Sequence, residues 1–164
     1  MHMDISIIKR AYATIGAHVP MAFDCGNLCE KACCLPDEDG QGGVHLFPGE
    51  EALVAGCDWC HMENPDGSIA PILVCDGPCD RDARPLACRI FPLTPVFHAG
   101  RLALRMDARA RAMCPLAMRG PRALNPEFCR AVLGALRGIA ADPEGREFLG
   151  KWIALEEQYR GFRL

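Results

Sequence analysis

Aromatic residues and long apolar runs are both scarce in this chain of 164 residues. Phe, Trp and Tyr together make up 7% of the sequence, and few of them lie beside the arginines, which disfavours stacking on nucleic-acid bases. No stretch reaches the roughly 18 consecutive apolar residues that a membrane-spanning helix needs. Residues 1–10 lack the charged, then apolar, then small order of a signal peptide. We therefore expect a cytoplasmic protein with no membrane partner.

Common catalytic motifs are missing as well. The sequence has no nucleophile elbow around a serine, no phosphate-binding loop and no HExxH. It is half hydrophobic and 24% charged, which is typical of a globular protein and excludes a mainly disordered one. Its length is that of one ordinary domain, so we expect a single domain over 1–164.

Charge is distributed unevenly along the chain. Residues 1–80 hold thirteen acidic and three basic residues, a net charge of −10, whereas residues 81–164 carry a net charge of +7. Eight arginines and one acid, Asp107, lie within 84–122. Such a run is compatible with an anionic partner. Because the whole chain is acidic, at −3, we favour packing of the basic half near the acidic half and near thiolates, and we consider nucleic acid an unlikely partner.

Hydrophobic periodicity predicts helices at both ends of the chain. Apolar residues at helical spacing predict a first helix over 4–18, which Pro20 ends. Asn125-Pro126 and Asp142-Pro143 each place proline after a capping residue and predict a C-terminal helical pair over 125–160.

The middle of the chain predicts short strands and loops. We expect strands at 44–47 and 69–74, a short helix at 48–55 with acids in its first turn, a hairpin over 96–106, and irregular structure at 25–43 and 57–68. The predicted fold class is α+β: a small single domain of short strands and metal-bound cysteine loops, flanked by N- and C-terminal helices.

The sequence is rich in cysteine, with eleven in all. Such a number indicates either disulfides or thiolate ligands for metal. The odd count, the absence of a visible export signal and a chain long enough to bury a core favour metal. Disulfide or redox chemistry and reduced structural thiols remain as alternatives. Cys129 is predicted to be a core residue of the first C-terminal helix.

Two groups of cysteines have spacings that suit a metal site. The first runs from Cys25 through Cys29 to the adjacent Cys33 and Cys34. The second extends over 75–88 and contains three cysteines and a charged segment. Thiols that are close in sequence can converge on one ion or cluster. Arg84 and Arg89 beside thiolates would lower the thiol pKa values by favouring the charged form, although both arginines could instead neutralise Asp80 and Asp82.

The order of these cysteines resembles a known family. Residues 25–34, then Cys79, then Arg84-Pro85-Leu86-Ala87-Cys88-Arg89-Ile90-Phe91-Pro92, then Cys114-Pro115, resemble the YkgJ-type CxxCxxCC cysteine-cluster proteins, described as zinc- or iron-chelating domains. The resemblance covers roughly 25–116. It differs in the first cluster, where the spacing is four residues rather than three.

The resemblance implies a metal-binding core over 25–116 that holds zinc or iron, the latter including an iron–sulfur cluster. It assigns metal roles to eight cysteines: Cys25, Cys29, Cys33, Cys34, Cys75, Cys79, Cys88 and Cys114. A similar cluster occurs in flagellin lysine methylases, so an iron–sulfur enzyme or accessory subunit related to protein-lysine methylation is an alternative. The expected partners are a metal ion and an unidentified protein. Catalytic residues stay unassigned.

Cys57-Asp58-Trp59-Cys60-His61 lies outside that resemblance. Its Cys-x-x-Cys-His pattern is compatible with half of a second zinc site, with a redox dithiol and with an exposed structural loop. Attachment of a c-type haem would require export. The sequence leaves the first three interpretations open.

Overall fold

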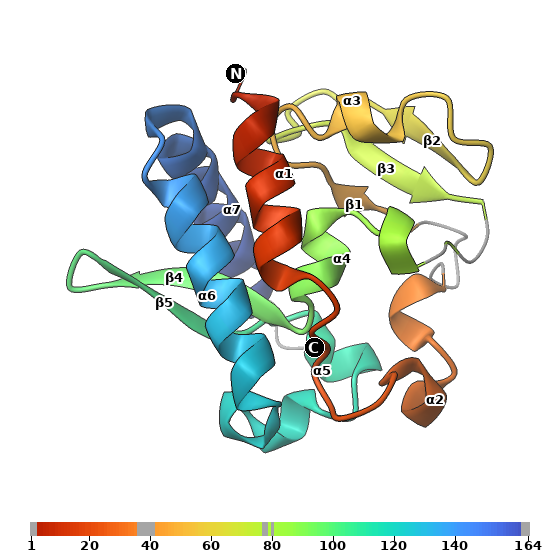
Figure 1. Cartoon of the computed structure of the whole chain (residues 1–164), viewed down its shortest axis with the longest axis vertical. Helices are drawn as coiled ribbons and strands as arrows, with labels where there is room; N and C mark the ends of the chain where they lie inside the picture. The colour runs from red at the N-terminus through yellow and green to blue at the C-terminus, as the bar shows by residue number, and fades with distance from the viewer. Residues whose placement is uncertain (1–2, 36–41, 77–78, 80, 162–164) are drawn as a thin grey trace.

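The computed structural model describes residues 3–35, 42–76, 79 and 81–161. A long helix begins the chain and two long helices end it: α1 (Ile5–Ile15), α6 (Pro126–Ala140) and α7 (Pro143–Gly161). Helix α1 lies along α6, and α7 packs behind them (Figure 1). The predicted terminal helices are therefore confirmed. The predicted α+β class is also confirmed, because the chain is a small single domain with short antiparallel sheets.

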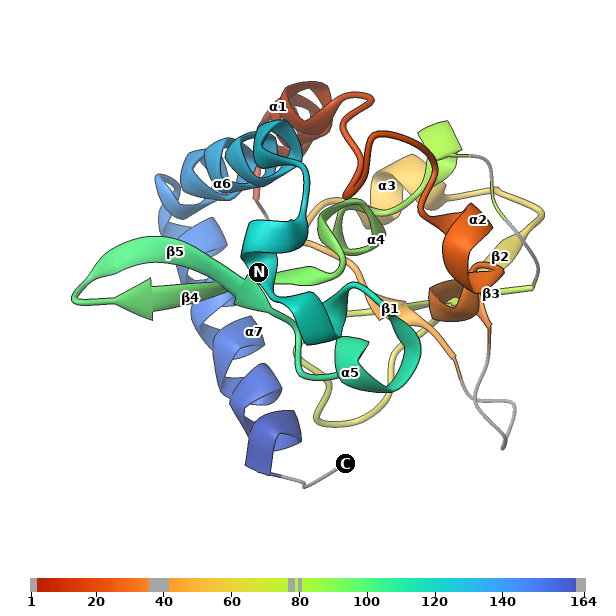
Figure 2. The same cartoon turned by 90° about the horizontal axis from the view of Figure 1, so that it is seen from below.

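Two small sheets lie apart from each other, one against the helices and one beside them. Strands β4 (Leu93–His98) and β5 (Arg101–Met106) form a hairpin against α6 and α7. Strands β1 (Val44–His45), β2 (Cys60–Glu63) and β3 (Ile72–Cys75) form an antiparallel sheet in the order β1-β3-β2. The views in Figures 1 and 2 place the hairpin on the left and the three-stranded sheet on the right.

Short helical turns fill the connections. They are α2 (Gly26–Cys29), η1 (Ala32–Cys34), α3 (Glu51–Val54), η2 (Arg81–Ala83), α4 (Leu86–Ile90), α5 (Ala110–Met113), η3 (Ala117–Arg119) and η4 (Pro121–Ala123). Strand β2 lies in the stretch predicted to be irregular, so that prediction was wrong for residues 60–63. Of the stretch predicted to be irregular at 25–43, residues 36–41 lie outside the described residues.

The main core is aromatic where the helices meet the central loop. Phe47, Phe148 and Trp152 pack with ring centroids 4.9–5.8 Å apart, and the indole N–H of Trp152 donates to Thr94 Oγ1 at 3.1 Å. The three-stranded sheet covers a separate, much smaller cluster of buried side chains, Leu46, Val54 and Leu73. Among the described helices, none is long and apolar enough to cross a membrane.

Candidate metal centre

The first cysteine group lies in two short helical turns, α2 and η1, which are separated by a sharp change in backbone direction. Gly26 N–H donates to Asp24 Oδ1 at 3.0 Å as α2 begins. Glu30 and Lys31 then adopt left-handed backbone conformations, with φ of 52° and 60°, which end α2 and start η1. A Cβ at Gly26 would lie 2.9 Å from Lys31 Cγ, so glycine permits this tight reversal. The reversal brings η1 back beside α2.

Helix α4, which carries Cys88, is fixed by a buried carboxylate. Glu50 is fully buried; its Oε1 accepts the Leu86 N–H at 2.5 Å and the Tyr12 hydroxyl, while its Oε2 accepts the Phe47 N–H at 2.9 Å. These bonds join α1, the loop before α3 and the start of α4. The predicted first-turn role was therefore wrong for Glu50, which lies just before α3 and holds α4 instead.

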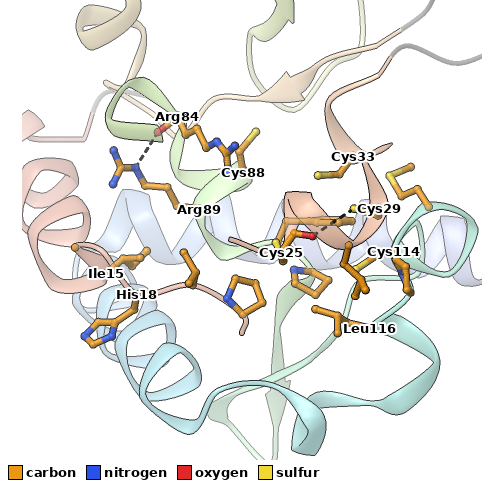
Figure 3. A pocket seen from close by; sticks show the side chains of 18 residues that line it. Ile15, His18, Cys25, Cys29, Cys33, Arg84, Cys88, Arg89, Cys114 and Leu116 are labelled. Atoms are coloured by element: carbon orange, nitrogen blue, oxygen red, sulfur yellow. Dashed lines mark hydrogen bonds between the residues drawn. The ribbon is translucent and has the colours of Figure 1, made fainter. Parts of the chain in front are cut away.

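One pocket collects cysteines from three separate parts of the chain. Its walls include five of the eight predicted metal ligands, together with arginines from the α4 region and His18. In Figure 3 four of these cysteines lie on one side of the pocket, while Cys88 lies with Arg84 and Arg89 on the other. The five are Cys25, Cys29, Cys33, Cys88 and Cys114.

Cys34 adjoins the pocket through its neighbour. The Cys33 thiol hydrogen-bonds to Cys34 and lowers the pKa of Cys34 to about 6, and the positive charges of Arg84 and Lys31 act in the same direction. The same hydrogen bond raises the pKa of Cys33. This adjacent pair therefore favours the thiolate form of Cys34 beside a pocket of further thiols.

The other two predicted ligands lie outside the pocket. Cys75 ends β3, and burial raises its pKa to about 11, with further contributions from the charges of Cys79, Cys34 and Cys60. Burial also raises the pKa of Cys88, to which Cys75, Cys34 and Cys79 add. Cys75 therefore lies in the three-stranded sheet, at the end of β3, where it is close enough to Cys79 and to the pocket residue Cys88 for their charges to interact.

The two predicted arginine roles separate in the structure. Arg84 lies beside the thiols, where its side chain hydrogen-bonds to Cys79. The guanidinium of Arg89 lies 4.4 Å above the Tyr12 ring, and it donates to the backbone carbonyls of Arg84 and Asp82 at 2.9 and 2.7 Å. Arg84 therefore places its positive charge beside the thiols, whereas Arg89 stabilises the backbone around α4 and packs on Tyr12.

The cysteine sulfurs suit a soft metal, but in the described part of the chain they are not arranged as a coordination sphere. All eleven cysteines are free thiols, and thiolates are ligands for zinc and for iron–sulfur clusters. Within the described ranges, no three Cys, His, Asp or Glu side chains are arranged to hold a metal ion. Binding would therefore require the short turns that carry the cysteines to close around the ion.

Glu50 is the main residue at this site that the sequence did not reveal. Its segment, Pro48-Gly49-Glu50-Glu51, has the pattern of an ordinary helix start. Only the packing of Tyr12 and Leu86 against it shows that the carboxylate is buried. No local pattern could have found it, because its partners lie 38 and 36 residues away.

Comparisons with protein families, with curated proteins and with solved structures give no match for this chain.

Proposed function

We propose that this protein binds a soft metal ion, zinc or iron, through thiolates gathered around the pocket between α2, α4 and α5. The observation that carries the proposal is the convergence of five cysteines on that one pocket. They come from residues 25–33, 88 and 114, so local sequence alone does not explain their meeting. The YkgJ-type resemblance supports the same assignment.

The surroundings of these thiols give them a reason to bind a cation. Burial, and after it the charges of neighbouring cysteines, raise the pKa values of Cys75 and Cys88. The hydrogen bond to Cys34, then burial and neighbouring charges, raise the pKa of Cys33, and each of these effects disfavours the charged thiolate. A divalent ion reverses this penalty, and its binding releases the thiol protons. A site of this kind also requires reduced thiols, which supports placing the protein in a reducing compartment such as the cytoplasm.

The residues have distinct roles in this proposal. Cys25, Cys29, Cys33, Cys88 and Cys114 supply sulfur ligands, and Cys34 supplies a thiolate beside Cys33. Glu50 holds α4, and therefore Cys88, in place through the Leu86 N–H. If an iron–sulfur cluster occupies the pocket, the protein is an electron carrier or an accessory subunit; if zinc does, its role is structural or in metal delivery.

Paired substitutions test the pocket directly. We expect Cys25→Ser/Cys29→Ser to weaken binding of Zn²⁺ at the pocket by more than about tenfold, since ligand shells tolerate little change. Cys129→Ser is the matched control, because Cys129 lies on α6 with its Sγ 3.9 Å from the Pro121 carbonyl oxygen. Circular dichroism verifies that the overall helix content is unchanged in both variants. Equal zinc binding by both variants would refute the pocket assignment.

A further inference from the structure

The three-stranded sheet brings two cysteines together across neighbouring strands. Cys60 on β2 is paired directly with Cys75 on β3. The next pair along the ladder is Trp59 and Asp76. The Asp76 N–H donates to the Trp59 carbonyl at 2.9 Å, so Trp59 and Asp76 form a hydrogen-bonded pair. Cys60 and Cys75 therefore occupy a non-hydrogen-bonded pair, where opposed side chains share a face and approach most closely.

A third cysteine approaches from the turn before β2. The Cys57 N–H donates to the Val54 carbonyl at 3.2 Å, and Gly56 has a left-handed φ of 81°, so the chain turns sharply out of α3 at this point. Cys57 lies close enough to Cys60 for its charge and hydrogen bonding to add to the burial that raises the pKa of Cys60. Three cysteines from two segments are therefore neighbours at the end of the sheet. Because no three side chains of the described residues are already arranged to hold a metal, an ion would have to draw their sulfurs together.

Cys79 follows the same end of β3, four residues after Cys75. Burial raises the pKa values of both Cys60 and Cys75, and the charge of Cys79 adds to both shifts. The four cysteines thus form a Cys-x₂-Cys pair and a Cys-x₃-Cys pair on the two arms of an antiparallel ladder. Both spacings fall in the range that structural zinc sites use.

His61 belongs to the opposite face of the sheet. Successive side chains of a strand alternate between faces, and the imidazole Nδ1 of His61 lies 3.1 Å from Asp76 Oδ1, while its Nε2 lies 3.5 Å from Glu63 Oε1. The sequence pattern Cys-x-x-Cys-His therefore separates in space. The cysteines turn toward one side and the histidine toward an exposed acidic pair on the other.

We propose that Cys57, Cys60, Cys75 and Cys79 form a second zinc site, distinct from the pocket, that clamps the end of the three-stranded sheet. The inference rests on the proposed function, in that this chain uses thiolates to bind metal. It assigns Cys75 and Cys79 to the sheet instead of the pocket, and it supplies partners for Cys57 and Cys60.

A structural ion would also stabilise the three-stranded sheet, which has a very small hydrophobic core. Within the part of the chain that the structure describes, the cluster under the sheet buries three side chains, Leu46, Val54 and Leu73, and a core of that size gives little stability on its own. Four thiolates around Zn²⁺ leave no open coordination position. The second site is therefore structural, and exchangeable or reactive metal belongs to the pocket.

Native mass spectrometry with Zn²⁺ counts the ions that each variant retains. We expect Cys57→Ser/Cys60→Ser to lose one zinc ion relative to the wild type while the pocket ion remains. Cys25→Ser/Cys29→Ser should lose the pocket ion and keep the sheet ion, and Cys129→Ser should keep both. A wild-type zinc count in Cys57→Ser/Cys60→Ser overturns the second site alone. Absence of both zinc and iron from the wild type overturns the proposed function as well.

Thiol protection in the wild-type protein gives a test that needs no variant to fold. We expect Zn²⁺ to protect Cys57 and Cys60 from alkylation by N-ethylmaleimide, as resolved by peptide mass spectrometry. Labelling of these two thiols that is equal with and without Zn²⁺ overturns the second site. So does a Cys60–Cys75 disulfide in protein that has been purified anaerobically.

Discussion

At the scale of single residues, the fold depends most visibly on one buried carboxylate. Glu50 accepts hydrogen bonds from Tyr12, Phe47 and Leu86, which belong to three segments that are distant in sequence. Burying a charged group is costly unless it is fully hydrogen-bonded. Each of these donors therefore stabilises both Glu50 and the helix that carries Cys88.

The hydroxyl of Tyr12 should account for a measurable part of that stability. We expect Tyr12→Phe to lower the free energy of unfolding by about 1–3 kcal/mol, because it removes a donor to a buried carboxylate. Tyr159→Phe, which alters the other tyrosine and keeps the ring beneath Arg109, is the control. Denaturant unfolding measures both. Equal stability of Tyr12→Phe and the wild type would show that the Tyr12–Glu50 bond contributes nothing.

Glu50 also predicts a pH dependence of stability. Burial raises its pKa above the usual 4.5, although the bonds from Tyr12, Leu86 and Phe47 oppose that shift. A raised pKa in the folded state gives a stabilising contribution that is complete below about pH 4.5 and is lost as the pH rises through the folded-state value. The advantage of the wild type over Glu50→Gln, which does not titrate there, should therefore be largest near pH 4 and shrink toward neutrality. An advantage that grows with pH would show that the hydrogen bonds outweigh burial.

At the scale of secondary-structure elements, α7 packs so closely on the chain before it that one glycine cannot be replaced. A Cβ at Gly145 would lie 2.3 Å from the Ile139 carbonyl oxygen and 3.0 Å from Met3 Sδ. A Cβ at Gly150, five residues along the same helix, would meet nothing within 4 Å. The two glycines therefore have opposite roles.

Alanine substitutions at the two positions should change stability in opposite directions. We expect Gly145→Ala to destabilise the protein by about 1–3 kcal/mol or more through overpacking. Gly150→Ala should stabilise it by about 0.5–1 kcal/mol, since alanine is the better helix former. Thermal unfolding compares the pair. A destabilised Gly150→Ala, or an unchanged Gly145→Ala, would contradict the packing of α7 on Ile139.

The sequence predicted the elements whose signals are local and missed those that depend on distant partners. The proline-capped helices at 126 and 143 and the hairpin around Ala99-Gly100 were confirmed, because capping and turn chemistry act within a few residues. Strand β2 was missed, since it contains Cys60, His61 and Glu63 and is mostly exposed. It is a strand only because β3 pairs with it. For the same reason, the Cys60–Cys75 pairing that supports the second site could not be read from the sequence.

At the scale of the whole molecule, part of the basic half of the chain neutralises itself. The buried Glu156 pairs with Arg105 and Arg160, and the buried Asp107 with Arg109 at 2.6 Å. All five residues belong to 81–164. Arg84, in contrast, faces the thiols, and the negative charges of Cys34, Cys79 and Asp24 raise its pKa. The excess of arginine in this half is therefore divided between internal ion pairs and the cysteine region.

Metal should stabilise one side of the molecule more than the other. The cysteines of both proposed sites lie in short turns and strand ends, whereas α6 and α7 bury a large apolar face. We expect a chelator to increase amide hydrogen exchange over 25–116 well before it affects α6 and α7, because metal binding is coupled to local folding there. Hydrogen exchange with and without chelator measures this. Equal protection of 25–116 in the two conditions would contradict a folding role for the metal.

The central claim is that the thiols of this chain bind metal, and metal analysis tests it most directly. The measurement is the zinc, iron and sulfide content of untagged protein purified anaerobically, together with its absorption spectrum and its count of reactive thiols. We predict at least one tightly bound zinc or iron per chain. Colourless zinc protein would indicate structural or zinc-binding sites, and a brown protein with a broad band near ~400 nm would indicate an iron–sulfur cluster. Protein without zinc or iron, in which all eleven thiols react freely in the native state, would contradict the account.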